Sequence, residues 1–308
     1  DGTGHTYNVA IGYNSMLSMG ANVAGNVAVG AFSLYYPSGN YNTAIGYNAI
    51  KGASAGTVTA YGNVGIGREV FQGITTGYNN VAVGYQTGYN ITTGVQNVIM
   101  GAYAGESVTT AQRNILIGYY AGGSGRTDAN NGIYIGGYAG QQSNSAGTIA
   151  IGHNASYYVD GDYNVFIGYA AGTGDATTTT AYDNVGIGKY ASLAISSGHS
   201  NVTLGVSAGQ TLTTGYYNTY VGKSAGNGGT TTHSNVAVGL NALSSVHGAS
   251  NVAIGRSALS STLDANQVAV GYAALESSTS GEGNTAVGYY TLQANTTGNY
   301  NTTLGHRA

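Results

Sequence analysis

Two stretches of this sequence match the pattern of a serine nucleophile. Gly205-Val206-Ser207-Ala208-Gly209 and Gly222-Lys223-Ser224-Ala225-Gly226 both read Gly-x-Ser-x-Gly, the turn that exposes the nucleophile of many hydrolases. That chemistry needs a strand followed by a helix, and a histidine that takes the serine proton. No helical periodicity follows either serine, and the equivalent place elsewhere holds Tyr103 or Tyr120. Both motifs therefore belong to a structural repeat, and we expect no catalytic residues and no enzyme.

Metal and cofactor chemistry has little support in the sequence. Asp160 and Asp162 flank a glycine and offer oxygens to calcium, but two carboxylates fall short of a coordination shell of roughly six to eight oxygens. The six histidines are dispersed, and the absence of cysteine excludes disulfides and thiolate metal sites. Asp160 and Asp162 are thus weak candidates, and we expect no metal and no cofactor.

The dominant feature is a repeat that ends in glycine. A β-branched residue, a variable residue, an aliphatic residue and a glycine recur eighteen times, with a mean period of about 17.2 residues. The motif glycines are Gly12, Gly30, Gly46, Gly67, Gly84, Gly101, Gly118, Gly136, Gly152, Gly168, Gly188, Gly205, Gly222, Gly239, Gly255, Gly271, Gly288 and Gly305. Such a short period is typical of a solenoid whose coils stack in chain order. The sequence therefore predicts an all-β, parallel β-solenoid (a β-roll) of about 18 coils, forming one repetitive domain over residues 1–308.

Positions are counted below from the motif glycine, so that −2 is two residues before it. Positions −3 and −1 are almost always aliphatic, which predicts a strand with these side chains inward, stacked as ladders such as Val81 on Val98 and Ile254 on Val270. Position +3 is nearly always Ala, Ser or Thr, which indicates close packing at a corner. Threonine- and glycine-rich stretches between the motifs read as turns.

Position −4 is asparagine in fifteen coils. An amide carries both donor and acceptor, so a column of amides can bond from coil to coil and satisfy backbone groups. We interpret the column as structural. Its members are Asn8, Asn26, Asn42, Asn63, Asn80, Asn97, Asn114, Asn164, Asn184, Asn201, Asn218, Asn235, Asn251, Asn284 and Asn301, with Gly132, Thr148 and Gln267 at the remaining three places.

Position −2 should then face outward. It is Ala or Gly in eleven coils and is never charged, although an exposed strand face ordinarily carries polar residues. We therefore expect this face to be covered along its length by self-association, three copies around a threefold axis being the natural arrangement. The bulkier Ile99, Leu116, Tyr134 and Phe166 would hold the subunits further apart. An exposed alanine-rich face on a monomer is the alternative.

The motif itself resembles known repeats. Asn-Val-Ala-Ile-Gly followed by x-x-Ala or x-x-Ser resembles the head repeat of YadA-type trimeric autotransporter adhesins, which implies a left-handed parallel β-roll assembled as a trimer. The longer period, and a stretch such as Thr296 to Thr302, resemble repeat arrays in bacteriophage tail-fibre proteins. The coils are longer than those of the adhesin heads, so we expect the extra residues to form a broader loop region, and we expect no coiled-coil stalk, membrane anchor or chaperone domain within residues 1–308.

Receptor contacts are expected where the repeat varies. The widest motif spacings insert larger loops at residues 51–62 and 173–183, and insertions in solenoids often form binding surfaces. Tyrosine is the second candidate, because exposed rings suit carbohydrate or protein surfaces, although stacking between coils explains them as well. The tyrosines that directly follow a motif glycine are Tyr13, Tyr47, Tyr85, Tyr119, Tyr169, Tyr272 and Tyr289.

Charge and hydropathy narrow the class of protein. A net charge of −3, with eight dispersed basic residues, predicts neither a nucleic-acid partner nor an anionic membrane partner, and no apolar run is long enough to cross a bilayer. The sequence starts at Asp1 without a signal-like segment, so we expect a processed or excised segment. We expect an extracellular location, on a virion tail or a cell surface.

Three functions compete at this stage. The first is a trimeric tail-fibre or adhesin shaft that presents a surface to a host receptor, either a cell-surface glycan or a protein. The second is an extracellular filament that polymerises end to end through uncapped solenoid edges. The third is ice binding by a flat threonine array, which the mostly alanine outward column disfavours.

Overall fold

The computed structural model describes residues 4, 6–20, 22–36, 39–52, 59–123, 129–175, 179–245 and 248–308. The chain divides into two compact units, residues 1–153 and 154–308. Unit 1 contains β1 (Val9–Ile11), β2 (Val27–Val29), β3 (Thr43–Ile45), β4 (Val64–Ile66), β5 (Val81–Val83), β6 (Val98–Met100), β7 (Ile115–Ile117), β8 (Ile133–Ile135) and β9 (Ile149–Ile151). Unit 2 contains β10 (Val165–Ile167), β11 (Val185–Ile187), β12 (Val202–Leu204), β13 (Thr219–Val221), β14 (Val236–Val238), β15 (Val252–Ile254), β16 (Val268–Val270), β17 (Thr285–Val287) and β18 (Thr302–Leu304).

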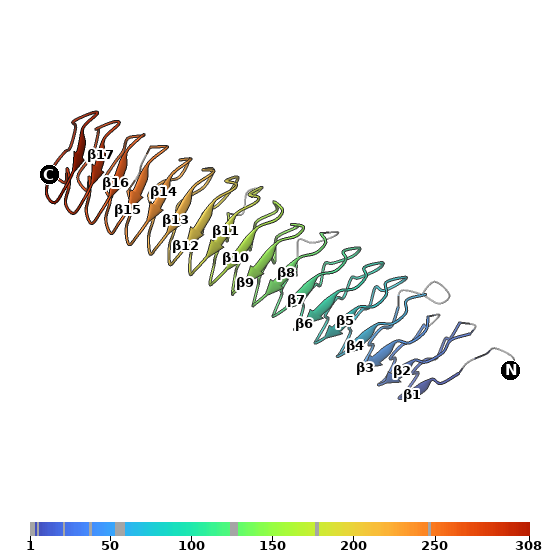
Figure 1. Cartoon of the computed structure of the whole chain (residues 1–308). Coiled ribbons are helices and arrows are strands. Elements are labelled where there is room, and N and C mark those ends of the chain that lie inside the picture. Colours follow the sequence, from blue (N-terminus) through green and yellow to red (C-terminus); the bar gives the residue numbers. More distant parts are fainter. Residues whose placement is uncertain are drawn as a thin grey trace. The chain divides into compact units, whose positions relative to one another are not determined.

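Each unit is a parallel β-solenoid with one strand of three residues per coil (Figure 1). Neighbouring strands pair in parallel, with equivalent motif positions opposite one another. Val81 pairs with Val98 and Ile254 with Val270, so the predicted ladders are confirmed. The predicted fold class, an all-β parallel solenoid with a period near 17 residues, is also confirmed. The prediction of a single domain stays a prediction.

The predicted orientation of the strand was wrong. Position −2, the middle residue of each strand, is buried in β2 to β17, as in Ala82, Ile99 and Leu116, none of which is exposed. The flanking positions −3 and −1 point outward, with Val98 36% and Met100 41% exposed. Alternation identifies two faces but not which of them is inside. Inside this narrow coil the small residues fit, and the aliphatic ladders form the outer face.

The interior is filled by matching side-chain sizes at positions −2 and +4 of the same coil. Where position −2 is large, as in Tyr134, Phe166 or Tyr220, position +4 is glycine. A Cβ atom on Gly140, for example, would overlap the ring of Tyr134. Where position −2 is alanine, position +4 is often a buried aliphatic residue. The expectation that Ile99, Leu116, Tyr134 and Phe166 hold subunits apart was therefore wrong, because all four lie in the core.

The corner after each strand depends on unusual backbone angles. The residues at positions +2 and +4 take left-handed conformations, as in Asn241 (φ 57°) and Leu243 (φ 50°). Leucine in this region costs roughly 1–2 kcal/mol, which its complete burial offsets. Position +3 lies between them and is buried, as in Ala242, so the predicted close packing at this corner is confirmed.

The buried phenol of Tyr220 makes stability depend on alkaline pH. Burial raises its pKa to about 12, whereas phenols of an unfolded chain titrate near pH 10. The folded state therefore keeps this proton longer, so its contribution is complete below pH 10 and is lost as the pH rises to about 12. The free energy of unfolding should fall by about 2 to 3 kcal/mol over this interval.

The matched variant is Tyr220→Phe, because Phe166 already occupies the equivalent position of β10. Denaturant unfolding of both proteins between pH 8 and 12 measures the effect. The variant should lose less stability than the parent by this amount, and an identical loss in the two proteins would contradict the assignment.

Candidate functional site

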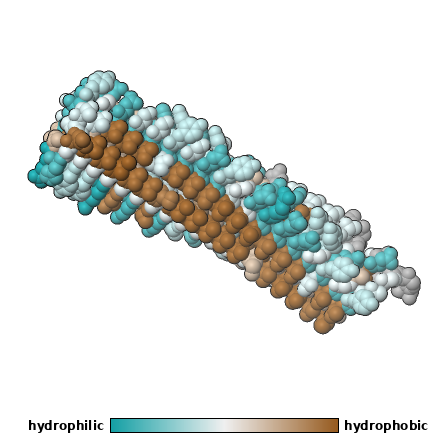
Figure 2. Space-filling model, in the orientation of Figure 1, coloured by the Kyte–Doolittle hydropathy of each residue, from teal (hydrophilic) through white to brown (hydrophobic). Residues whose placement is uncertain are grey.

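The most extensive surface feature is an uncharged face made of the first and last residue of every strand, called the aliphatic face below. It contains only Val, Ile, Leu, Met and a few Thr. Many of its side chains are well exposed, among them Ile66 at 37%, Val238 at 36% and Ile254 at 40%. Figure 2 shows these side chains as brown rows over the strands. Soluble monomers rarely expose such patches, which commonly mark interaction sites.

The aliphatic face is large enough to hold a partner. Nine strands about 4.8 Å apart, and a face about 10 Å wide, give about 400 Å² in each unit. Each unit therefore supplies about half of the ~800 Å² that one partner contributes to a stable interface of ordinary size. Its β-branched side chains are stiff, so little side-chain entropy is lost when they are covered.

Residues at positions +1 and +2 form the second feature, called the corner ridge below. Tyr13 is 70% exposed, Tyr47 and Tyr119 46%, Tyr169 48% and Tyr289 43%, whereas Tyr85 and Tyr272 are half-buried. The ridge is thus exposed, and it begins directly after the motif glycine, next to the aliphatic face. All seven tyrosines proposed for receptor contact lie in it.

Aromatic contacts continue along the ridge from coil to coil. The rings of Tyr103 and Tyr120 stack with their centroids 4.7 Å apart, and Tyr272 stacks on Tyr289 at 5.2 Å. Hydrogen bonding with Tyr272, together with desolvation, raises the pKa of Tyr290 to about 12. Sequence reasoning singled out position +1 only. Tyrosines at position +2 of five coils also belong to the ridge, and their fixed distance from the motif glycine was the available signal; they are Tyr103, Tyr120, Tyr138, Tyr190 and Tyr290.

A second aromatic column lies at position −6. Tyr182, His199, Tyr216 and His233 stack nearly in parallel, with centroid distances of 4.8, 5.2 and 4.8 Å. This column was not predicted from the sequence, because the histidines were considered only as metal ligands. Stacking between coils accounts for their positions.

The asparagine column is hydrogen-bonded throughout most of both units. The Asn201 backbone N–H and side-chain Nδ2 both donate to Asn184 Oδ1, at 3.1 and 3.0 Å, and Nδ2 also donates to the Gly215 carbonyl at 2.8 Å. Where asparagine is missing, the Gly132 N–H still donates to Asn114 Oδ1 at 2.8 Å. From Asn26 to Asn284 the side chains of the column are buried and bonded, so they stabilise the stack and offer nothing to a ligand.

The residues considered for chemistry lie in regular positions of the repeat. Backbone atoms of Asp160 and Asp162 bond to Thr179 and Asp183 of the next coil, at 2.7 and 3.2 Å. Among the described residues, no three His, Asp or Glu side chains come together as metal ligands. Ser207 and Ser224 occupy the left-handed position +2, and in the described part of the chain no helix follows them.

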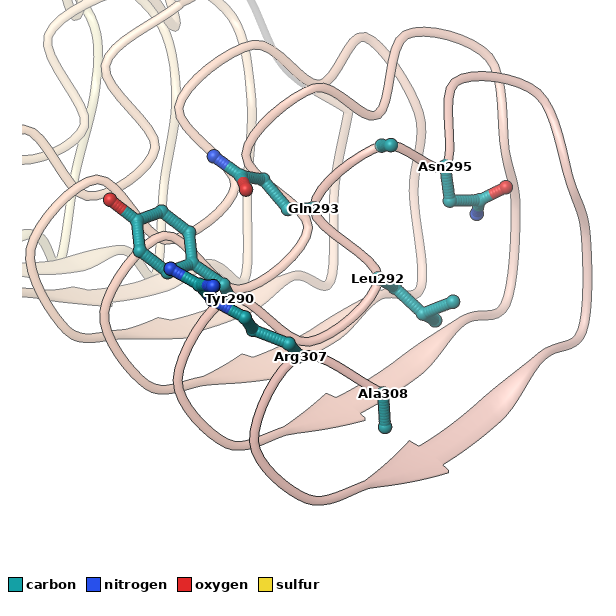
Figure 3. Close-up of a pocket in the computed structure, with 7 residues that line it drawn as sticks. Tyr290, Leu292, Gln293, Asn295, Arg307 and Ala308 are labelled. Atoms are coloured by element: carbon teal, nitrogen blue, oxygen red, sulfur yellow. The ribbon is translucent and has the colours of Figure 1, made fainter.

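Two further surfaces define no enclosed site. The predicted receptor loops, residues 51–62 and 173–183, lie partly outside the described residues. At the last coil, Tyr290, Leu292, Gln293, Asn295, Arg307 and Ala308 line a hollow of about 510 Å³ that is widely open to solvent (Figure 3).

These features define the class of protein as a parallel β-solenoid with an exposed aliphatic sheet face. No family model matches the sequence, and no curated protein gives a significant match. No described segment forms a helix long and apolar enough to span a membrane.

Proposed function

We propose that this chain is a structural segment of an extracellular fibre, a trimeric shaft of the tail-fibre or surface-adhesin kind that presents a receptor-binding surface. The observation that carries the proposal is the aliphatic face. A face without charge, about 400 Å² in each unit, favours a permanent protein cover.

The cover we propose is two further copies of the same chain. Within each unit the face has the same two columns in every coil, so one contact repeats along its length and closes around an axis parallel to the stack of that unit. The resemblance to YadA-type head repeats favours three copies over two. The sequence predicted a cover over position −2. The exposed positions are −3 and −1 instead, and their large apolar side chains support the proposal of a protein cover.

The test is the solution mass of the full chain by light scattering. We expect three times the chain mass of 30.9 kDa. The double variant Val221→Lys/Ile254→Lys places two charges on the aliphatic face and should give monomers, because a buried uncompensated charge costs several kcal/mol. The matched control, Thr214→Lys/Thr231→Lys, adds the same charge at exposed turns and should stay trimeric.

Circular dichroism checks that both variants fold. A monomeric parent protein would overturn the covered face. Dimers would overturn the threefold arrangement, and filaments that grow with concentration would support end-to-end polymerisation in its place. A trimer that survives both lysines of the face variant would place the contact elsewhere.

A further inference from the structure

The basic residues of unit 2 share one edge of the coil. Residues 154–308 contain four of them, Lys189, Lys223, Arg256 and Arg307, and all four stand in the corner ridge. The seven acidic residues of this unit stand at other positions: Asp160, Asp162, Asp175, Asp183, Asp264, Glu276 and Glu282. In a chain of net charge −3, the corner ridge of unit 2 thus carries cations only.

Aromatic rings hold several of these cations at the surface. The ammonium nitrogen of Lys189 lies 4.8 Å from the ring centroid of Tyr190. The guanidinium of Arg256 lies 5.6 Å from that of Tyr272. Among the described residues, Lys189, Lys223 and Arg256 are exposed and form no ion pair with a carboxylate. Contact with a ring face positions a cation without neutralising it, so these charges remain available to an anion.

The spacing of the cations is regular. Lys189, Lys223 and Arg256 follow strands β11, β13 and β15, so they stand on alternate coils, about 10 Å apart. The coils between them present Val206 and Leu240, which are 44% and 37% exposed. The ridge therefore alternates a positive charge with an apolar side chain.

We propose that the corner ridge of unit 2 binds a linear acidic polysaccharide with an anionic group on every second sugar. An extended polysaccharide advances per sugar ring by about the coil spacing of ~4.8 Å, so its anionic groups meet the cations of alternate coils. The apolar faces of the sugar rings pack on Val206, Leu240 and the tyrosine rings beyond Arg256. A nucleic acid fits less well, because it carries a phosphate on every nucleotide and the ridge offers a cation on every second coil.

The inference rests on the proposed function, in which the shaft presents a receptor-binding surface. The experiment measures binding of the full chain to hyaluronan, whose carboxylates stand on alternate sugars, by surface plasmon resonance. Neutral dextran and poly-glutamate serve as probes that lack the charge and the sugar, respectively. We expect binding to hyaluronan only. The double variant Lys223→Gln/Arg256→Gln should bind about ten-fold more weakly, and Lys51→Gln/Arg113→Gln, outside the ridge, should bind normally.

Equal binding to poly-glutamate, tighter binding to single-stranded RNA, or equal weakening by the two double variants would overturn the inference. So would the absence of hyaluronan binding. Light scattering on the same samples separates the two proposals. A trimer that does not bind hyaluronan contradicts only the proposal that the ridge binds polysaccharide. A monomer that binds hyaluronan contradicts only the proposal of a trimeric shaft.

Discussion

Alanine in place of Gly205 should destabilise the solenoid by at least about 4 kcal/mol. This motif glycine has φ 134°, and a Cβ atom would lie 2.7 Å from both the carbonyl carbon and the oxygen of Gly222 in the next coil. Backbone atoms cannot rotate away from such a contact, so the two coils must separate and lose hydrogen bonds such as Gly222 N–H to Leu204 O. Chemical denaturation measures the change.

Two controls separate the causes of this effect. Gly305 has a similar φ of 141°, but a Cβ there would meet only the Ala308 Cβ at 3.6 Å, so Gly305→Ala reports the backbone strain alone. Gly137 belongs to a coil with neighbours on both sides, and it has room for a Cβ beside the His153 ring at 3.4 Å. Gly137→Ala therefore measures the cost of a Cβ inside the stack where it meets no backbone atom. Both should cost about 1–3 kcal/mol or less. Similar losses for Gly205→Ala and Gly305→Ala would show that contact between coils is unimportant.

The repeat made the strand, its parallel stacking and its ladders predictable, since a period near 17 residues admits few other folds. The direction of the side chains was not predictable from alternation alone. Inward aliphatic residues are the usual solution, and here the coil is too narrow for two rows of Val and Ile. A signal was present in the sequence, because glycine stands at position +4 in each coil where Ile99, Leu116, Tyr134, Phe166 or Tyr220 stands at position −2. Because the sizes at positions −2 and +4 compensate each other, the two side chains must share the same interior space.

The corner ridge was only partly predictable for a different reason. Tyr47 or Tyr289 can be assigned to a surface corner once the motif glycine is known. The grouping of Lys223 with Arg256 becomes visible only when positions are counted from successive motif glycines, because along the chain the basic residues look dispersed. The solenoid converts residues far apart in sequence into neighbours one or two coils apart.

Because the side-chain sizes at positions −2 and +4 compensate each other, paired substitutions at these positions should show a large coupling in stability. Coil 13 carries Tyr220 with Gly226, and coil 14 carries Ala237 with Leu243, so the pattern changes between them. Leu243→Gly alone removes a fully buried side chain and should cost about 2–5 kcal/mol. Ala237→Phe alone forces a ring into the space of Leu243 and should cost about 3 kcal/mol.

The double variant Ala237→Phe/Leu243→Gly should be far more stable than the sum of these losses, within about 2 kcal/mol of the parent. In the double variant, coil 14 also has a large side chain at position −2 and glycine at position +4. The new phenylalanine ring then stacks on Tyr220 of the preceding coil. Glycine also accepts the left-handed angle that Leu243 holds at φ 50° without strain. Denaturant unfolding of all four proteins gives the coupling free energy. Additive losses would mean that the two positions fill separate spaces, because only side chains that share one cavity can rescue each other.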